Sequence, residues 1–276
     1  MKTSLTVVVR RKIKQFNENI SVDSDKSLSI RSILIGSISQ GISTVRNILE
    51  SEDVKSTITV CRKLGVKIIK IKPKTYKIYG NGLGSLYLRK KTELNFGNSG
   101  TASRLMIGIL STTPNIRVKL RGDHSLNKRS MRKLINLMTK FGAYFLPKYK
   151  NNFPLKMISS EMPVGINYNA NVSAQLKSAV ILAGLNSFGK TIIEERIKSR
   201  DHTENFLKRN SRAINIKKGK KKIITILGKK ELKPFNINVG GDPSSAAFFV
   251  ALTLLVKNSS LKIKNVGLNP TRSGFF

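Results

Sequence analysis

Apolar residues of this chain gather in four segments that are long enough for helices and are apolar on nearly every face. These segments cover residues 33–38, 105–110, 179–185 and 248–256. A helix that is apolar all round is typical of a protein interior, because it leaves no polar face for water. The pattern therefore predicts four buried helices.

Each buried helix is followed by a β-branched segment that predicts a strand. The expected strands are residues 43–45, 116–120, 191–193 and 261–263. Amphipathic second helices are expected after the first three strands, at residues 52–64, at 125–141, and from Ser199 to the segment 210–213. The first two of these helices stop before a glycine, which is a common C-terminal signal.

The same unit recurs along the chain. Each buried helix follows a short polar or glycine-rich turn and starts with Ser or Thr, at Ser27, Thr101, Ser173 and Ser244, which are 74, 72 and 71 residues apart. Repeats of this kind bury their faces against one another. The sequence predicts a three-fold pseudo-symmetric α/β domain over residues 27–240, with sheets outside and the apolar helices at its centre. Residues 1–26 and 241–276 are expected to form a fragment of a second domain.

The net charge of +36 over 276 residues is extreme. A basic excess can indicate nucleic acid or an acidic membrane surface as a partner. Lysines are nevertheless scattered through every segment, and residues 217–222 are the one dense run. No tryptophan is present, and no aromatic side chains interleave with the basic ones as a stacking platform would require. The pattern argues against nucleic acid, although a basic nucleic-acid-binding protein stays an alternative.

The chain has one cysteine, Cys61, which rules out an internal disulfide and fits a reducing compartment. We expect this residue to be a small buried apolar side chain on a helix. The apolar runs are too short to span a bilayer, and no secretion signal is visible, so we expect a cytoplasmic protein.

The repeated helix starts are the candidate chemistry. The first amides of a helix lack partners and lie at its positive end, so they attract anions. Basic residues stand close to these starts, and two more arginines are expected on first helical turns; they are Lys26, Arg31, Arg104, Lys177, Arg129 and Arg200. A guanidinium binds phosphate or carboxylate through two parallel hydrogen bonds. The pattern predicts a ligand with several anionic groups.

Six motifs occur in a fixed order at these places. They are residues 26–31 (KSLSIR), 98–104 (NSGTASR), 173–179 (SAQLKSA), 199–204 (SRDHTE), 241–248 (GDPSSAAF) and 269–272 (NPTR). Together they resemble the 5-enolpyruvylshikimate-3-phosphate synthases over essentially the whole chain. The resemblance implies an inverse α/β barrel fold of repeated βαβαββ units, with one complete three-unit domain and part of a second. It also implies a 3-phosphoshikimate 1-carboxyvinyltransferase of the shikimate pathway to aromatic amino acids.

That activity joins shikimate 3-phosphate to phosphoenolpyruvate and releases phosphate. Matching the motifs to the family implies the phosphoenolpyruvate contacts Lys26, Asn98, Gly100, Arg129 and Gln175. Of these, Lys26 is the implied catalytic residue. The shikimate 3-phosphate contacts are Lys26, Ser27, Arg31, Ser173, Ala174, Gln175, Ser199 and Arg200. The resemblance implies no metal and no cofactor. His124 and His202 are expected to be helix-start or packing residues.

The chain departs from the family pattern at Ser24, where a glycine is usual, at Ser130, where a proline is usual, and in its extent. The family's proton-shuttling carboxylates are implied to lie beyond Phe276, in a missing C-terminal third. We therefore expect little or no turnover from this chain alone, and a non-catalytic anion-binding remnant is a further alternative. A monomer is expected. The sequence leaves open whether a separately encoded part completes the protein.

Overall fold

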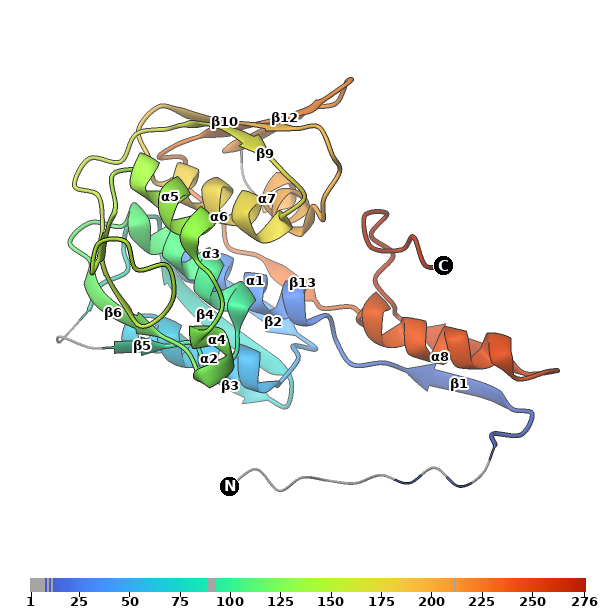
Figure 1. The fold of residues 1–276 in the computed structure, drawn as a ribbon. Coiled ribbons are helices and arrows are strands. Elements are labelled where there is room, and N and C mark those ends of the chain that lie inside the picture. The colour runs from blue at the N-terminus through green and yellow to red at the C-terminus, as the bar shows by residue number, and fades with distance from the viewer. Residues whose placement is uncertain (1–7, 9, 11, 89–92, 211) are drawn as a thin grey trace. The chain divides into compact units, whose positions relative to one another are not determined.

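The computed structural model describes residues 8, 10, 12–88, 93–210 and 212–276 (Figure 1). The chain divides into two compact units. The larger is Ser24–Val239, and the smaller combines the residues up to Asp23 with Gly240–Phe276. All residues that the sequence assigns to the candidate site lie in the larger unit.

Within the described part of the larger unit, the strands form three four-stranded sheets of the same order. The first is β13 (Asn236–Asn238), β2 (Gln40–Arg46), β4 (Thr75–Asn81) and β3 (Lys67–Lys72). The second is β5 (Glu93–Asn95), β6 (Arg117–Arg121), β8 (Leu155–Ile158) and β7 (Tyr144–Leu146). The third is β9 (Asn167–Ala170), β10 (Lys190–Glu195), β12 (Lys222–Leu227) and β11 (Ile214–Lys217).

Each sheet pairs its first two strands in parallel and the others antiparallel. The second strand of each sheet directly follows an apolar helix, as the sequence pattern predicts. The equivalence of the three sheets confirms the α/β fold of repeated units.

The three apolar helices of this unit are α1 (Lys26–Ile38), α3 (Gly100–Ser111) and α6 (Ala174–Leu185), and the core forms around them. Their side chains are buried on nearly every face, which confirms that prediction for these helices. Gly108 permits the close approach of α3 to α6, because a Cβ at this position would lie 2.5 Å from the carbonyl oxygen of Ala179.

Local capping explains where these helices begin. The side chains of Asp25, Ser99 and Ser173 accept hydrogen bonds from backbone amides three residues later, at 2.8, 3.2 and 3.4 Å. Each cap satisfies one of the amides that a helix start leaves unpaired. The polar turns that mark the repeat in the sequence are therefore helix caps in the structure.

The second helices differ in part from the prediction. They are α2 (Glu52–Lys63), α4 (His124–Asn127), α5 (Arg132–Lys140) and α7 (His202–Asn210). The single helix expected over residues 125–141 is wrong, because the chain breaks between α4 and α5. At the break, the amide of Met131 donates to the carbonyl of Asn151 at 2.6 Å instead of to a carbonyl of the preceding helical turn.

Two arginines consequently lie outside the helices on which they were expected. Arg129 lies in the break between α4 and α5 rather than on a first turn. Arg200 precedes α7. The amide of Asn205 in this helix donates to the carbonyl of Asp201 at 2.9 Å, so the helical hydrogen bonds begin after Arg200. Both arginines are exposed, and both lie on backbone outside the helices.

The smaller unit contains β1 (Asn17–Ser21), α8 (Pro243–Leu255) and β14 (Ser260–Lys264), with β1 and β14 paired in parallel. The predicted burial of this fourth apolar helix is wrong: Phe248 is 80% exposed and Leu255 83% exposed. A helix that is apolar all round needs cover on every side. The described part of this unit offers α8 a two-stranded sheet.

Two strands belong to a different unit from the helix that follows each of them in the chain. β1 precedes α1 in the chain but pairs with β14 of the smaller unit, and β13 precedes α8 but pairs with β2 of the larger one. The chain therefore passes between the units twice, after Asp23 and after Val239. Among the described residues, every helix is too short or too polar to cross a membrane.

Cys61 is fully buried on α2, which confirms the expectation for this residue. Burial raises the pKa of its thiol to about 12. The thiolate is the reactive form, so we expect the native thiol to react with a disulfide reagent such as DTNB at least about 100-fold more slowly than in the urea-unfolded chain. Equal labelling rates in the two states would contradict this burial.

Candidate anion-binding site

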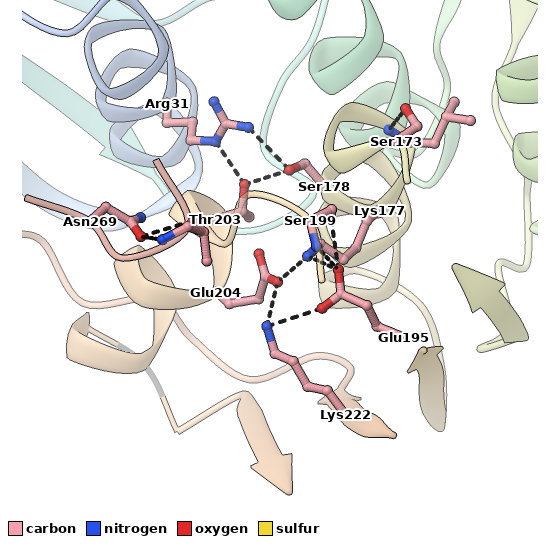
Figure 2. A network of polar contacts seen from close by, with 12 residues as sticks. Arg31, Ser173, Lys177, Ser178, Glu195, Ser199, Thr203, Glu204, Lys222 and Asn269 are labelled. Carbon is pink, nitrogen blue, oxygen red and sulfur yellow. Dashed lines mark hydrogen bonds and ion pairs between the residues drawn. The ribbon is translucent and has the colours of Figure 1, made fainter. Parts of the chain in front are cut away.

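The starts of α1, α6 and α7 lie side by side. Nε of Arg31 on α1 donates to Thr203 Oγ1 on α7 at 2.8 Å, and its Nη2 donates to Ser178 Oγ on α6 at 3.2 Å. Thr203 in turn donates to Ser178 at 2.8 Å (Figure 2). Each of these residues lies in the first two turns of its helix. The buried Arg31 therefore joins three helix starts.

The start of α3 lies next to the start of α6. Nη1 of Arg104 donates to Gln175 Oε1 at 2.8 Å and to the carbonyl of Gly100 at 3.1 Å. Nε2 of Gln175 donates to Thr101 Oγ1 at 2.9 Å. The two helices thus share a chain of side-chain hydrogen bonds at the same end, and four helix starts of the larger unit are brought together.

Two guanidinium groups meet beside Gly100. A Cβ built on this residue would lie 2.8 Å from Nη1 of Arg104 and 3.2 Å from Nη1 of Arg129. Nη2 of Arg129 donates to Asn98 Oδ1 at 2.9 Å, and this bond ties the break between α4 and α5 to the turn before α3. The absent side chain of Gly100 leaves the space in which both cations lie.

The electrostatics of this place favour an anion. Burial, together with the charge of Arg129, lowers the pKa of Arg104. Among the described residues, no carboxylate forms an ion pair with either arginine. The two like charges repel each other at the positive end of α3, where the helix dipole adds to the positive potential. A phosphate or carboxylate placed here would offset that repulsion.

Lys26 and Ser27 lie at the start of α1. Nζ of Lys26 is 3.0 Å from Asp53 Oδ2, and its side chain is half exposed. The carbonyl of Ser27 accepts a hydrogen bond from Arg31 Nη1 at 3.0 Å. A ligand that binds Lys26 would have to compete with Asp53, but the exposure of the ammonium group leaves it accessible.

Similarity to known proteins establishes the family to which this chain belongs. A family model described as EPSP synthase (3-phosphoshikimate 1-carboxyvinyltransferase) matches residues 10–276. This chain belongs to the EPSP synthase family. It is 42% identical over 260 residues to the 3-phosphoshikimate 1-carboxyvinyltransferase of Novosphingobium aromaticivorans, covering 93% of this chain and 58% of that protein. It is 40% identical over 271 residues to the protein of that name from Zymomonas mobilis, covering 98% and 59%.

A solved EPSP synthase of Acinetobacter baumannii is also similar. It superposes with a TM-score of 0.84 at 35% identity, covering 95% of this chain and 58% of that one. The family predicted from the six motifs is therefore confirmed, and so is the EPSP synthase-like α/β fold. The chain spans just under three fifths of the length of these relatives.

One basic residue of the EPSP synthase motifs lies elsewhere than expected. Lys177 was predicted to supply a cation at the start of α6, but it is fully buried, with Nζ 2.6 Å from Glu195 Oε1 and 2.7 Å from Glu204 Oε1. Lys222 adds Nζ at 3.3 Å from Glu195 Oε2 and 3.1 Å from Glu204 Oε1 (Figure 2). Lys177 is therefore neutralised inside the protein and is not a cation of the helix opening.

Ser199 and Arg200 lie between β10 and α7. The amide and the hydroxyl of Ser199 both donate to Glu195 Oε1, at 3.0 and 2.6 Å. Burial would raise the pKa of Glu195, but hydrogen bonds from Lys177 and Ser199 and the charges of Lys177 and Lys222 lower it overall. Glu195 is thus held as a carboxylate, and sequence analysis missed it. A glutamate that ends the apolar strand Ile192–Ile193 is the signal that could have found it.

Both histidines are helix-start residues, as expected. His124 is the first residue of α4, and His202 is the first residue of α7. His202 is buried with Nε2 3.9 Å from Asp25 Oδ2, the cap of α1. The described residues contain no group of three or more His, Cys, Asp or Glu side chains placed to hold a metal ion.

Hydrogen bonds and close approaches join several of the predicted site residues in groups. One group is Ser27 with Arg31, and a second is Gly100 and Gln175, both bonded to Arg104, together with Asn98 and Arg129 beside Gly100; Ser199 binds Glu195 instead. Ser173 caps α6, and Ala174 is its first residue. Lys26 and Arg200 present exposed side chains next to these helix starts in sequence. The ligand contacts assigned to them stay predictions.

Proposed function

We propose that the larger unit binds shikimate 3-phosphate and phosphoenolpyruvate for enolpyruvyl transfer. In this reaction the 5-hydroxyl oxygen of shikimate 3-phosphate bonds to C2 of phosphoenolpyruvate, and the bond from C2 to the phosphate oxygen breaks. The hydroxyl proton leaves, and inorganic phosphate is released. Family membership supports the proposal. The chain spans 58% of the length of the relative from Novosphingobium aromaticivorans, and we propose the activity and the two substrates for it on the contacts of the larger unit.

The observation that carries the proposal is the pair of guanidinium groups beside Gly100. Arg104 and Arg129 converge at the positive end of α3, and no described carboxylate is paired with either. A phosphate accepts two parallel hydrogen bonds from one guanidinium and a further set from backbone amides. We assign the phosphoenolpyruvate phosphate to this place, with Asn98, Gln175 and Lys26 around it.

Shikimate 3-phosphate is assigned to the starts of α1, α6 and α7. Ser173, Ala174 and Gln175 present the first amides of α6, Ser27 and Arg31 lie at α1, and Ser199 and Arg200 precede α7. Two anionic substrates repel each other, so a site that joins them needs fixed cations at the correct spacing. Holding both ligands in one geometry also removes much of the entropic cost of their encounter.

Calorimetric titration of this chain tests the proposal. We expect one molecule of shikimate 3-phosphate to bind about 100-fold more tightly than shikimate, because the added phosphate gains charge-assisted hydrogen bonds worth about 1.5–3 kcal/mol each. A matched control is Lys218→Ala, which removes a positive charge from the lysine run without touching the helix starts. If random-sequence DNA binds and shikimate 3-phosphate has no effect on that binding, the alternative of a nucleic-acid-binding protein holds.

A further inference from the structure

Four charged side chains form a balanced cluster inside the larger unit. Lys177, Glu195 and Glu204 are essentially fully buried, and Lys222 is 19% exposed. Each carboxylate lies within ion-pair distance of both ammonium groups, at 2.6 to 3.3 Å (Figure 2). Removing four charges from water is costly, and well-packed apolar residues would often serve stability as well. The presence of the cluster is therefore weak evidence for a role in stability alone.

The two glutamates differ in their contact with Ser199. Both bind Lys177 and Lys222, but only Glu195 also accepts hydrogen bonds from Ser199: within the described structure its Oε1 accepts from both the amide and the hydroxyl of that residue. These two bonds join the end of β10 to the residue just before Arg200. They close the connection over residues 196–198 into a short loop, and Cα of Arg200 lies one peptide unit, about 3.8 Å, from Cα of Ser199.

The amide and the hydroxyl of Ser199 both donate their hydrogens to Glu195. A carboxylate held ionised can only accept hydrogen bonds, so the hydroxyl hydrogen of Ser199 points to Glu195. The lone pairs of its oxygen can then accept from a ligand hydroxyl but not from a fully ionised phosphate, which has no hydrogen to donate. Arg200, by contrast, is exposed, and among the described residues none forms an ion pair with its guanidinium group. Its five donors remain for an anion.

We propose that Glu195 is a positioning residue: through Ser199, it fixes the connection between β10 and α7 so that Arg200 meets the phosphate of shikimate 3-phosphate. Lys177 and Lys222 keep Glu195 ionised and hold its carboxylate in place. Ser199 is the tether in this arrangement, and Arg200 supplies the phosphate contact. The inference rests on the proposed function, because it assumes that the phosphate of this ligand binds at the start of α6.

The test compares Glu195→Gln with Glu204→Gln. Both variants remove one buried carboxylate from the same two lysines, so both carry a similar cost in stability. We expect Glu195→Gln to weaken shikimate 3-phosphate about 10-fold, with shikimate changed less than about 2-fold, because the loss concerns the phosphate contact. Glu204→Gln is expected to change both affinities less than about 2-fold. Calorimetry measures the four constants, and circular dichroism confirms that each variant is folded.

A double-mutant cycle separates positioning from a general loss of structure. If Glu195 acts through Arg200, Arg200→Ala and the double variant Glu195→Gln/Arg200→Ala bind shikimate 3-phosphate equally weakly. Should Glu195→Gln fail to fold, Ser199→Ala removes the tether without changing charge and is expected to weaken the same ligand about 5-fold. Equal effects of Glu195→Gln and Glu204→Gln, or additive effects in the cycle, would overturn the inference alone. A wild-type chain that does not prefer shikimate 3-phosphate to shikimate would overturn the proposed function and this inference together.

Discussion

Replacing Lys177 with methionine is expected to lower the free energy of unfolding by about 3–5 kcal/mol. The side chain is fully buried, and its ammonium group is 2.6 and 2.7 Å from two buried carboxylates. Methionine fills a similar volume but leaves Glu195 and Glu204 with only the charge of Lys222 between them. An unpaired buried charge is far more costly than an apolar residue at the same place. Urea denaturation monitored by circular dichroism measures the change.

Lys222→Met is the matched control for this experiment. Lys222 contacts the same two carboxylates, but at 3.3 and 3.1 Å and with a side chain that is 19% exposed. Water reaches this end of the cluster, so we expect a loss of about 1 kcal/mol. If both variants lose the same stability, or if Lys177→Met loses less than about 1 kcal/mol, the cluster is not held by Lys177 as described.

Replacing Arg129 with alanine is expected to weaken the binding of phosphoenolpyruvate about 100-fold in the presence of saturating shikimate 3-phosphate. The reason is the loss of a bidentate contact from a guanidinium group, in which each charge-assisted bond is worth about 1.5–3 kcal/mol. Arg129 is exposed and lies outside the helices, so the free energy of unfolding should change by less than about 0.5 kcal/mol. Calorimetric titration measures the affinity.

Two further variants give this prediction its controls. Arg129→Lys keeps the charge but loses the planar fork, so we expect an intermediate loss of about 10-fold. Arg132→Ala removes another exposed arginine, on the first turn of α5, and is expected to leave the affinity within about 2-fold of the wild type. A comparable loss in Arg132→Ala would mean that overall charge, rather than the geometry beside Gly100, governs binding.

The features that the sequence predicted well are those with local causes. Asp25, Ser99 and Ser173 cap their helices through amides three residues away, so the short turns that hold them were sufficient evidence. The strands likewise follow from β-branched composition and from their place after a buried helix. The three equivalent sheets then follow from the equal spacing of the repeats.

The features that were missed depend on distant partners. The break before α5 involves the carbonyl of Asn151, and the burial of Lys177 depends on carboxylates at positions 195 and 204. Because α6 is apolar on nearly every face, its periodicity could not indicate to which side Lys177 points. The exposure of α8 depends on which other segments cover it, and its own sequence carries no such information. The closeness of the Arg104 and Arg129 guanidinium groups also could not be predicted, because it arises only when the chain is folded.

The central claim is that four helix starts of the larger unit form one site for anionic substrates. The most direct measurement is an amide chemical-shift titration of the isotope-labelled chain with shikimate 3-phosphate. The account predicts that amides at residues 27–29, 99–102, 174–176 and 199–202 shift together with a single dissociation constant. Shifts confined to one of these helix starts, or to the lysine run 217–222, would contradict it.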